Sequence, residues 1–438
     1  MRGAEATITE RLAAIVARPL AAAERERAAL HLLDWAGCVL GGLREETGRA
    51  MAALGGHPLA GAGTGEVGLS GGFGSLIEMD DVHRAALLHP GPVVGAVVAA
   101  LPGRDGLAAL VRGYEAMIRL GAAVGPGHYA FFHNTATCGG IGAAVAAASA
   151  MDLGPERTVW AMGHAMSLAG GLWQCRHEPV ATKHLHVAEA ARRGLAAASW
   201  AGAGLAGPRS ILEGVQGFFA AVARDGDPAA VVAAPEGPWR IREVSFKPWP
   251  ACRHAHPAID AALALRGRIT GEPLVVTVET YGDAVKFCDR PAPVTAGEAR
   301  FSLQHAVAVA LSAGPPPPEA FEAGALGAQA ALRGRVRVVR DAGFDAAYPA
   351  HFGARVTVET GAGRWSETVA DAWGDAENPM AAGDVVAKFR RLAAWGGVGE
   401  ALAGRLEAAV MALPGGGGME AVTAAMRAVA AQGQGSAG

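Results

Sequence analysis

The chain has 438 residues and a mass of 44.3 kDa, a length that suggests two or three domains and a sizeable core. Hydrophobic residues make up 51% and charged residues 18%, which excludes a disordered chain. The formal net charge of -3 and the pI near 6.5 lack the basic character of a nucleic-acid-binding protein. Aromatic residues reach only 6% and glycine contributes 62 residues, so we expect a core of Ala, Leu and Val in closely packed helices.

Targeting and redox features predict a cytoplasmic protein with no membrane partner. The most apolar stretch, Gly91 to Pro102, is too short to span a bilayer. Residues 1–14 lack the apolar stretch and the cleavage site of a signal peptide. The five cysteines are widely spread and none forms a C-x-x-C pair, so we expect reduced thiols rather than disulfides or a zinc or iron–sulfur centre.

Helical periodicity dominates the chain up to about residue 239. From Glu24 to Leu40, apolar residues recur on one helical side, and Gly41 ends the helix. Residues 55–74 are rich in glycine and predict a loop. Connections that carry Pro, Gly and Asp separate the further predicted helices: Leu107–Val124, Gly139–Met151, Glu156–Gly170 and Val187–Ala203.

The pattern becomes β-like after residue 239. Segments that alternate or are rich in valine predict strands at Trp239–Phe246, Leu274–Thr280, Arg335–Arg340, Ala354–Thr360 and Trp365–Val369. A Gly-Ala-Gly turn joins the last two, which therefore predict a hairpin. Helices are predicted between the strands, at His256–Arg266 and Glu298–Ser312, and Pro315–Pro318 predicts a rigid connector.

The C-terminal part returns to helix from Pro379, with flexible glycine-rich pieces expected at residues 414–418 and 432–438. This order of elements predicts a mainly α protein with a smaller α+β domain. The expected large helical domain takes residues 1–245 plus 395–438, and the expected smaller domain takes residues 246–394.

Several short motifs are generic and carry no prediction of their own. Residues 63–68 satisfy G-x-G-x-x-G and residues 68–72 satisfy G-x-S-x-G, but no strand precedes either motif. The H-x-H pairs at residues 184–186 and 254–256 lack a carboxylate cluster that would complete a metal site. We therefore predict no metal and no cofactor.

Five short segments concentrate polar and ionisable residues in otherwise apolar surroundings. They are residues 78–91, 133–139, 182–186, 247–256 and 300–305. Histidines exchange protons near neutral pH, while Lys and Arg bind carboxylates. A helix beginning after Thr137 and Gly139 would add backbone donors for anions. This equipment suits removal of a proton next to a carboxylate, although each histidine alone also has a structural interpretation and Asp80 or Asp81 could cap a helix.

In this order, the segments resemble the MmgE/PrpD family, which includes 2-methylcitrate dehydratase and cis-aconitate decarboxylase. The first similarities are D-D-x-H…H-P-G at residues 80–91, H-N-T-A-T-C-G at 133–139 and T-K-x-L-H at 182–186. Further similarities are G-P…L-E-G at 207–214, K-x-x-P…H at 247–256, R-P…E-A-x-F-S at 290–302 and N-P-M at 378–380. The resemblance covers nearly the whole chain.

The resemblance implies a large helical domain made from both ends of the chain, a smaller lid domain, an active site in the cleft and usually a homodimer. It also implies metal-independent chemistry on small di- or tricarboxylates. Four residues stand where the family places active-site residues: His89, His133, Lys183 and His256. With Asp81, which would orient a histidine, they form the predicted catalytic set. The residues predicted to bind substrate are Arg253, His83, Glu78, His305 and Thr137.

Departures from the family pattern bear on the reaction. The family's D-F-D-D-T segment reads E-M-D-D-V at residues 78–82, and His305 stands where a tyrosine is frequent. A hydroxyl and a phenol are therefore replaced and an imidazole is gained, which changes the acid–base set.

The leading hypothesis is a cofactor-independent, dehydratase-type lyase. A base removes the proton α to a carboxylate and an acid protonates a leaving β-hydroxyl. His133 or His256 would be base or acid, and Lys183 and Arg253 would bind carboxylates. The alternative is an epimerase of an amino or imino dicarboxylate that uses the same carbanion. A decarboxylase and a non-catalytic binding protein rank behind these two.

Overall fold

The computed structural model describes residues 5–103, 105–178 and 180–435, and these form two compact units. Unit 1 takes residues up to Leu76, Asp80–Val244 and everything from Ala381. Unit 2 takes Ile77–Met79 and Ser245–Met380. The expected boundary at residue 394 differs from this division, because helix α18 (Ala382–Trp395) packs on α2 (Ala22–Gly42) within unit 1.

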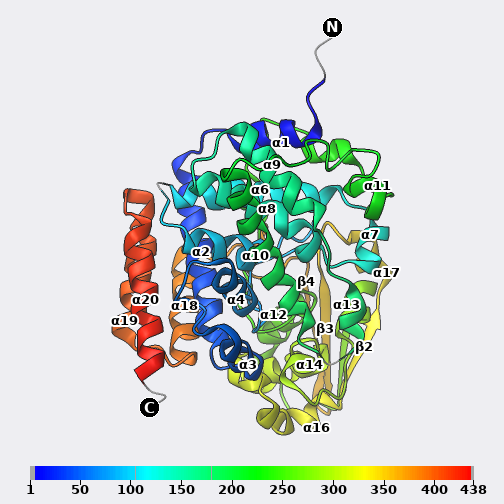
Figure 1. The fold of residues 1–438 in the computed structure, drawn as a ribbon. Coiled ribbons are helices and arrows are strands. Elements are labelled where there is room, and N and C mark those ends of the chain that lie inside the picture. Colours follow the sequence, from blue (N-terminus) through cyan, green and yellow to red (C-terminus); the bar gives the residue numbers. More distant parts are fainter. Residues whose placement is uncertain (1–4, 104, 179, 436–438) are drawn as a thin grey trace. The chain divides into compact units, whose positions relative to one another are not determined.

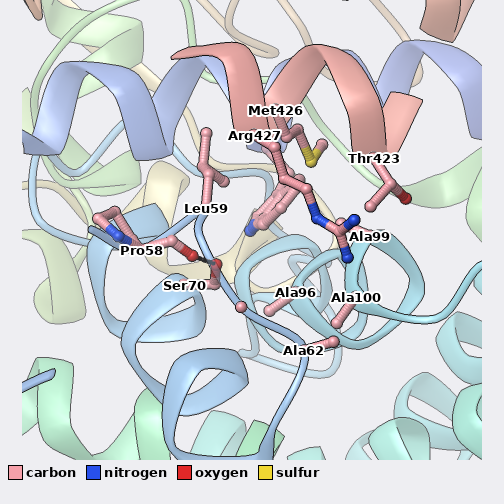
Figure 2. Close-up of a pocket in the computed structure, with 12 residues that line it drawn as sticks. Pro58, Leu59, Ala62, Ser70, Ala96, Ala99, Ala100, Thr423, Met426 and Arg427 are labelled. Atoms are coloured by element: carbon pink, nitrogen blue, oxygen red, sulfur yellow. Dashed lines mark hydrogen bonds between the residues drawn. The ribbon is translucent and has the colours of Figure 1, made fainter. Parts of the chain in front are cut away.

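Unit 1 is helical. Its other α-helices are α1 (Ile8–Val16), α3 (Glu46–Gly55), α4 (Thr64–Gly74), α5 (Pro90–Ala100), α6 (Gly106–Ala123), α7 (Pro126–Phe131), α8 (Asn134–Ala150), α9 (Pro155–Ser167), α10 (Thr182–Gly202), α11 (Phe218–Val222), α19 (Glu400–Met411) and α20 (Met419–Gly435). Short 3₁₀ helices are η1 (Trp173–His177), η2 (Pro228–Val232), η3 (Arg240–Glu243) and η7 (Leu413–Gly415). Figure 1 shows α18 in orange beside α2 in blue, so both ends of the chain build this unit.

Helix α8 lies at the centre of unit 1 and is buried all round from Asn134 to Ala148. Its sequence is almost entirely Ala, Gly and small polar residues, so α5, α6, α9 and α10 can approach it closely. The alanine and glycine excess of the composition is thus used in helix–helix packing.

Unit 2 combines a small sheet with helices, as expected for an α+β domain. Its α-helices are α12 (His256–Arg266), α13 (Gly282–Cys288), α14 (Ala296–Arg300), α15 (Leu303–Ser312), α16 (Ala330–Arg333) and α17 (Ala342–Ala347). Its 3₁₀ helices are η4 (Arg253–Ala255), η5 (Pro318–Phe321) and η6 (Ala323–Gln329). Its strands are β1 (Val275–Thr280), β2 (Val336–Arg340), β3 (Ala354–Thr360) and β4 (Gly363–Val369).

The sheet has the strand order β2-β1-β3-β4, with β1 and β2 parallel and the other pairs antiparallel. Buried residues alternate along β1, where Val276 and Val278 face the core of unit 2. Helix α12 packs against β3 and β4, as Figure 1 shows. The predicted hairpin is confirmed, because β3 and β4 pair from Ala354–Val369 to Thr360–Gly363.

Two predicted elements are wrong. The glycine-rich segment 55–74 contains helix α4, and Trp239–Phe246 contains the 3₁₀ helix η3 instead of a strand. The predicted helix Glu298–Ser312 is interrupted between α14 and α15. Residues 432–435 continue α20, and residues 436–438 lie outside the described residues.

Within the described part of the chain, none of the helices combines the length and the apolar character needed to cross a lipid bilayer.

Candidate active site

Asp81 is the centre of a buried network in unit 1. Its Oδ2 atom accepts hydrogen bonds from Nδ1 of His31 and the hydroxyl of Tyr114, both at 2.7 Å. Its Oδ1 atom accepts the backbone N–H of Gly91, also at 2.7 Å. A Cβ atom at Gly91 would come within 2.6 Å of this carboxylate, so glycine is required there. The carboxylate therefore anchors the start of α5 and pairs with a histidine that the sequence analysis did not select.

His89 is the N-cap residue of α5, and its ring is held by the same loop. Its Nδ1 atom lies 2.9 Å from the backbone oxygen of Asp81 and 3.1 Å from Oδ2 of Asp80. Its backbone N–H donates to Oγ1 of Thr135 at 3.1 Å, which ties the start of α5 to the start of α8. Asp80, not Asp81, is thus the carboxylate beside the predicted catalytic His89.

His133 is the N-cap residue of α8 and is 2% exposed. Its ring lies 4.4 Å from the ring of Trp173 and 5.6 Å from that of His186, measured between centroids. Its buried Nδ1 atom has no hydrogen-bond partner among the described residues. Burial lowers the pKa of His133 well below its usual value, and the charge of Lys183 lowers it further. The imidazole is therefore neutral at pH 7 and available as a base.

Lys183 lies in the first turn of α10, at the third helix start of this region. His89, His133 and Lys183 thus mark the N-terminal ends of α5, α8 and α10. Each helix start carries a partial positive charge. At α5 this charge acts without open N–H groups, because Pro90 and Pro92 have no N–H and that of Gly91 donates to Asp81. Together with the ammonium group, these starts create a surrounding that favours an anionic ligand.

The predicted site residues of unit 2 are engaged with one another. Nδ1 of His256 accepts a hydrogen bond from Arg253 at 3.2 Å, and Nε2 donates to the backbone oxygen of Ala251 at 3.0 Å. Arg253 also forms a buried ion pair with Asp375. Both ring nitrogens of His256 therefore have protein partners, and its catalytic role stays a prediction.

Glu78 lies in unit 2 next to a buried lysine. Its carboxylate is 3.6 Å from Nζ of Lys247, and both side chains are almost fully buried. The φ angle of Glu78 is +54°, a left-handed conformation that costs a non-glycine residue about 1–3 kcal/mol. Such strain is frequent at functional sites, and the role of Glu78 in substrate binding stays a prediction.

The remaining predicted residues have protein partners for their polar atoms. In unit 1, Nε2 of His83 lies 2.8 Å from Glu243, and Oγ1 of Thr137 lies 2.9 Å from Nε2 of His128. In unit 2, Nε2 of His305 donates to the backbone oxygen of Ala320 at 2.9 Å. Their roles in substrate binding also stay predictions.

One group of side chains in unit 2 has the composition of a metal site. Among the described residues, the side chains that could bring three ligand atoms together are His351, Asp371 and Glu377 in unit 2. Nδ1 of His351 lies 2.9 Å from Oδ1 of Asp371, which an ion pair alone explains. This group contains no predicted site residue, and the prediction of no cofactor stays as it was.

Sequence reasoning missed Trp173 and His186, which surround His133 in unit 1. His186 had a signal, because it stands three positions after Lys183 and shares its face of α10. Trp173 had none, since nothing in the sequence connects η1 with the start of α8.

Comparison with known proteins assigns the family. The MmgE/PrpD N-terminal domain model matches residues 6–231 and the C-terminal domain model matches residues 249–413. The chain belongs to the MmgE/PrpD family, which confirms the resemblance inferred from the motifs.

Three relatives carry names that refer to one activity. Human cis-aconitate decarboxylase is 30% identical over 261 residues, and mouse cis-aconitate decarboxylase is 30% identical over 189 residues. A cis-aconitate decarboxylase-like protein of Aspergillus oryzae is 26% identical over 361 residues. The matches cover 54%, 41% and 74% of this chain, respectively. The chain spans about half of the human relative (52%), 38% of the mouse relative and 74% of the fungal one.

Proposed function

We propose that the protein is a cofactor-independent lyase of the dehydratase type, which removes a proton α to a carboxylate of a small di- or tricarboxylic acid. One observation carries this proposal: the neutral imidazole of His133 lies beside Lys183 where three helices begin. A base must be uncharged to accept a proton, and a carboxylate needs cationic surroundings.

The chemistry divides between these groups. His133 accepts the proton from the α carbon, and the electron pair left behind delocalises into the carboxylate. Lys183 and the helix starts stabilise the doubly charged, enolate-like group. Loss of one such electrostatic donor typically lowers kcat by about 10²–10³.

The names of the relatives favour a second candidate, decarboxylation. Loss of CO₂ next to a carboxylate leaves the same type of carbanion. In this reaction C–C cleavage, not proton removal, forms the carbanion, and an acid must then protonate it. An epimerase would return the proton to the opposite face of the carbanion. The three reactions share their charged intermediate, so they differ in which bond breaks.

Proton NMR in deuterium oxide tests the proposal. The panel is citrate, 2-methylcitrate, cis-aconitate, malate, aspartate and methylsuccinate. A dehydratase forms or hydrates an alkene, an epimerase incorporates deuterium at the α carbon without loss of water, and a decarboxylase releases CO₂. If none of these changes occurs with any member, the proposal fails.

Variants locate the chemistry. We expect Lys183→Met and His133→Gln each to lower kcat/KM at least 100-fold, because each removes a group assigned to the charged intermediate. Lys286→Met removes an exposed lysine of unit 2 and serves as the matched control. Unchanged turnover in Lys183→Met would contradict the assignment.

We also propose that the enzyme is a homodimer that acts in the cytoplasm. The five cysteines form no disulfide with one another, in keeping with a reducing compartment. Sedimentation equilibrium tests the oligomeric state, and a mass of one chain at all concentrations would overturn the dimer.

A further inference from the structure

Three buried polar atoms around His133 lack hydrogen-bond partners among the described residues. They are Nδ1 of His133, Nδ1 of His186 and Nε1 of Trp173. The three rings contact one another through His133, at centroid distances of 4.4 Å to Trp173 and 5.6 Å to His186. All three belong to unit 1.

Such a cluster is costly unless something completes it. Each unsatisfied buried polar group costs about 1–3 kcal/mol, and native proteins keep few of them. The three atoms also match in chemistry, since an indole N–H can only donate whereas an imidazole nitrogen can donate or accept. A bound molecule with oxygen acceptors and an exchangeable proton would satisfy all three.

The backbone fixes the rings in this arrangement. Gly171 lies two residues before Trp173. The backbone oxygen of Gly171 accepts a hydrogen bond from the N–H of His133 at 2.9 Å. The φ angle of Gly171 is +115°, and a Cβ atom there would lie 2.4 Å from Ala136 and 3.6 Å from the ring of His186. This loop therefore lies tightly between α8 and α10, and η1 follows it directly.

Two imidazoles this close together are not both protonated to the cationic form, because their positive charges would repel each other. The charge of a protonated His186 is one of the causes that lower the pKa of His133, after burial and Lys183. His133 is the more deeply buried ring, while His186 is only partly buried. Burial lowers the pKa of both rings, and that of His133 the more strongly. When the negative charges of a bound carboxylate substrate draw a proton into the site, His186 is therefore the ring that holds it.

We propose that His186 is the second catalytic acid–base residue of this site, and that Nε1 of Trp173 donates a hydrogen bond to the same leaving oxygen. The proposal rests on the function proposed above. The Cα–H bond breaks and its proton passes to His133. The electron pair forms the Cα=Cβ double bond, the Cβ–O bond breaks, and the oxygen leaves as water with the proton of His186. In the hydration direction, His186 takes a proton from water and His133 returns one to carbon.

The test separates proton exchange from elimination. With the active member of the carboxylate panel, deuterium incorporation at the α carbon and alkene formation are measured by NMR in deuterium oxide. We expect His186→Gln to lower elimination 100-fold or more and to keep exchange within about tenfold of the wild type, because general acid catalysis contributes about 10²–10⁴. His133→Gln should abolish both. Trp173→Phe should lower elimination about tenfold and leave exchange unchanged.

The control variant is His164→Gln, in which a side chain on α9 loses its hydrogen bond to the backbone oxygen of Leu205. This variant should leave both rates within twofold. His186→Asn, which keeps a polar atom near the position of Nδ1, is measured if His186→Gln does not fold. Equal loss of exchange and elimination in the folded variant, or no loss of either, would overturn the role of His186 while the proposed function stands. A wild-type enzyme that neither exchanges nor eliminates would overturn both.

Discussion

Five histidines, four of them predicted site residues and the fifth His186, differ in how their ring nitrogens are used. His256, His305 and His83 use both nitrogens in contacts with protein groups, so their tautomers and orientations are fixed. His133 and His186 each keep a buried Nδ1 atom without a partner among the residues that the structure describes. A buried imidazole with an open nitrogen costs stability, so its retention favours a chemical role.

The first prediction concerns the titration of His133. Because burial is the main cause of its lowered pKa and Lys183 is the next, we expect the ring to titrate below 6.5 and to remain neutral as the pH falls from 8 to 6.5. Removal of the cation in Lys183→Met should move the titration toward higher pH. Long-range ¹H–¹⁵N correlation spectra of the imidazole measure both values. A wild-type ring that titrates at 6.5 or above would contradict this interpretation.

For single residues, the sequence was sufficient to select candidate site residues but not to predict which side chains they contact. His89, His133 and Lys183 could be selected because each stands in a short polar segment at a helix start. Trp173 could not, because its contact with His133 depends on the path of the loop through Gly171. The partner of Asp81 was also hidden, since His31 lies in an ordinary helical pattern 50 residues earlier.

The helices of unit 1 owe their spacing to glycine. Gly194 of α10 faces α8 so closely that a Cβ atom would lie 2.2 Å from Cβ of Ala143 and 2.6 Å from the backbone nitrogen of Ala144. Backbone atoms cannot yield as a flexible side chain can. The contact between the two helices that bear His133 and Lys183 therefore depends on this residue.

The second prediction compares two helical glycines. We expect Gly194→Ala to lower the free energy of unfolding by about 1–3 kcal/mol, because overpacking forces α8 and α10 apart. Gly404 lies exposed inside α19, with nothing within 4 Å of a Cβ atom built there. We therefore expect Gly404→Ala to raise the free energy of unfolding by about 0.5–1 kcal/mol. Urea denaturation measures both. Equal effects of the two substitutions would contradict the role given to the close contact.

In both wrongly predicted elements, contacts with the rest of the fold outweigh the local propensity. Glycine is a poor helix former, yet in α4 a Cβ atom at Gly71 would lie 3.1 Å from the backbone oxygen of Pro92. Close packing therefore overrides propensity there. The segment Trp239–Phe246 has a β-like composition, but among the described residues it pairs with none of the four strands of the sheet, and its Ile241 is buried in the core of unit 1. Local patterns identified elements well where packing agreed with propensity, as in the hairpin of β3 and β4.

At the scale of the whole chain, helix α18 near the C-terminus packs on helix α2 near the N-terminus within unit 1. Nζ of Lys388 on α18 lies 2.6 Å from Oδ1 of Asp34 on α2, and each side chain is 1% exposed. The ring of Phe389 also packs on Gly37, where a Cβ atom would be 3.1 Å from Phe389 Cα. Residues separated by 354 positions thus share one buried ion pair. A single sequence offers no way to pair these two residues, although both lie in predicted helices.

The third prediction is that removal of one partner of this ion pair destabilises unit 1, because the other charge is left buried without compensation. Lys388→Met leaves a buried carboxylate that must lose its charge, and protonation of an aspartate with an ordinary pKa near 4 costs about 4 kcal/mol at pH 7. We therefore expect a loss of about 3–5 kcal/mol in the free energy of unfolding. Urea denaturation followed by tryptophan fluorescence measures it, with Lys286→Met as the exposed control.

The pH dependence and a double variant complete this test. Burial raises the pKa of Asp34 to about 6, so its proton is bound more tightly in the folded state than in the unfolded state. The contribution of Asp34 to the free energy of unfolding is complete below its unfolded pKa near 4 and is lost as the pH rises through 6. The difference in the free energy of unfolding between Lys388→Met and the wild type should therefore shrink as the pH falls toward 4. Asp34→Leu combined with Lys388→Met removes both charges and should fold within about 1 kcal/mol of the wild type at pH 7. If the double variant is as unstable as Lys388→Met, the loss comes from packing and not from an uncompensated charge.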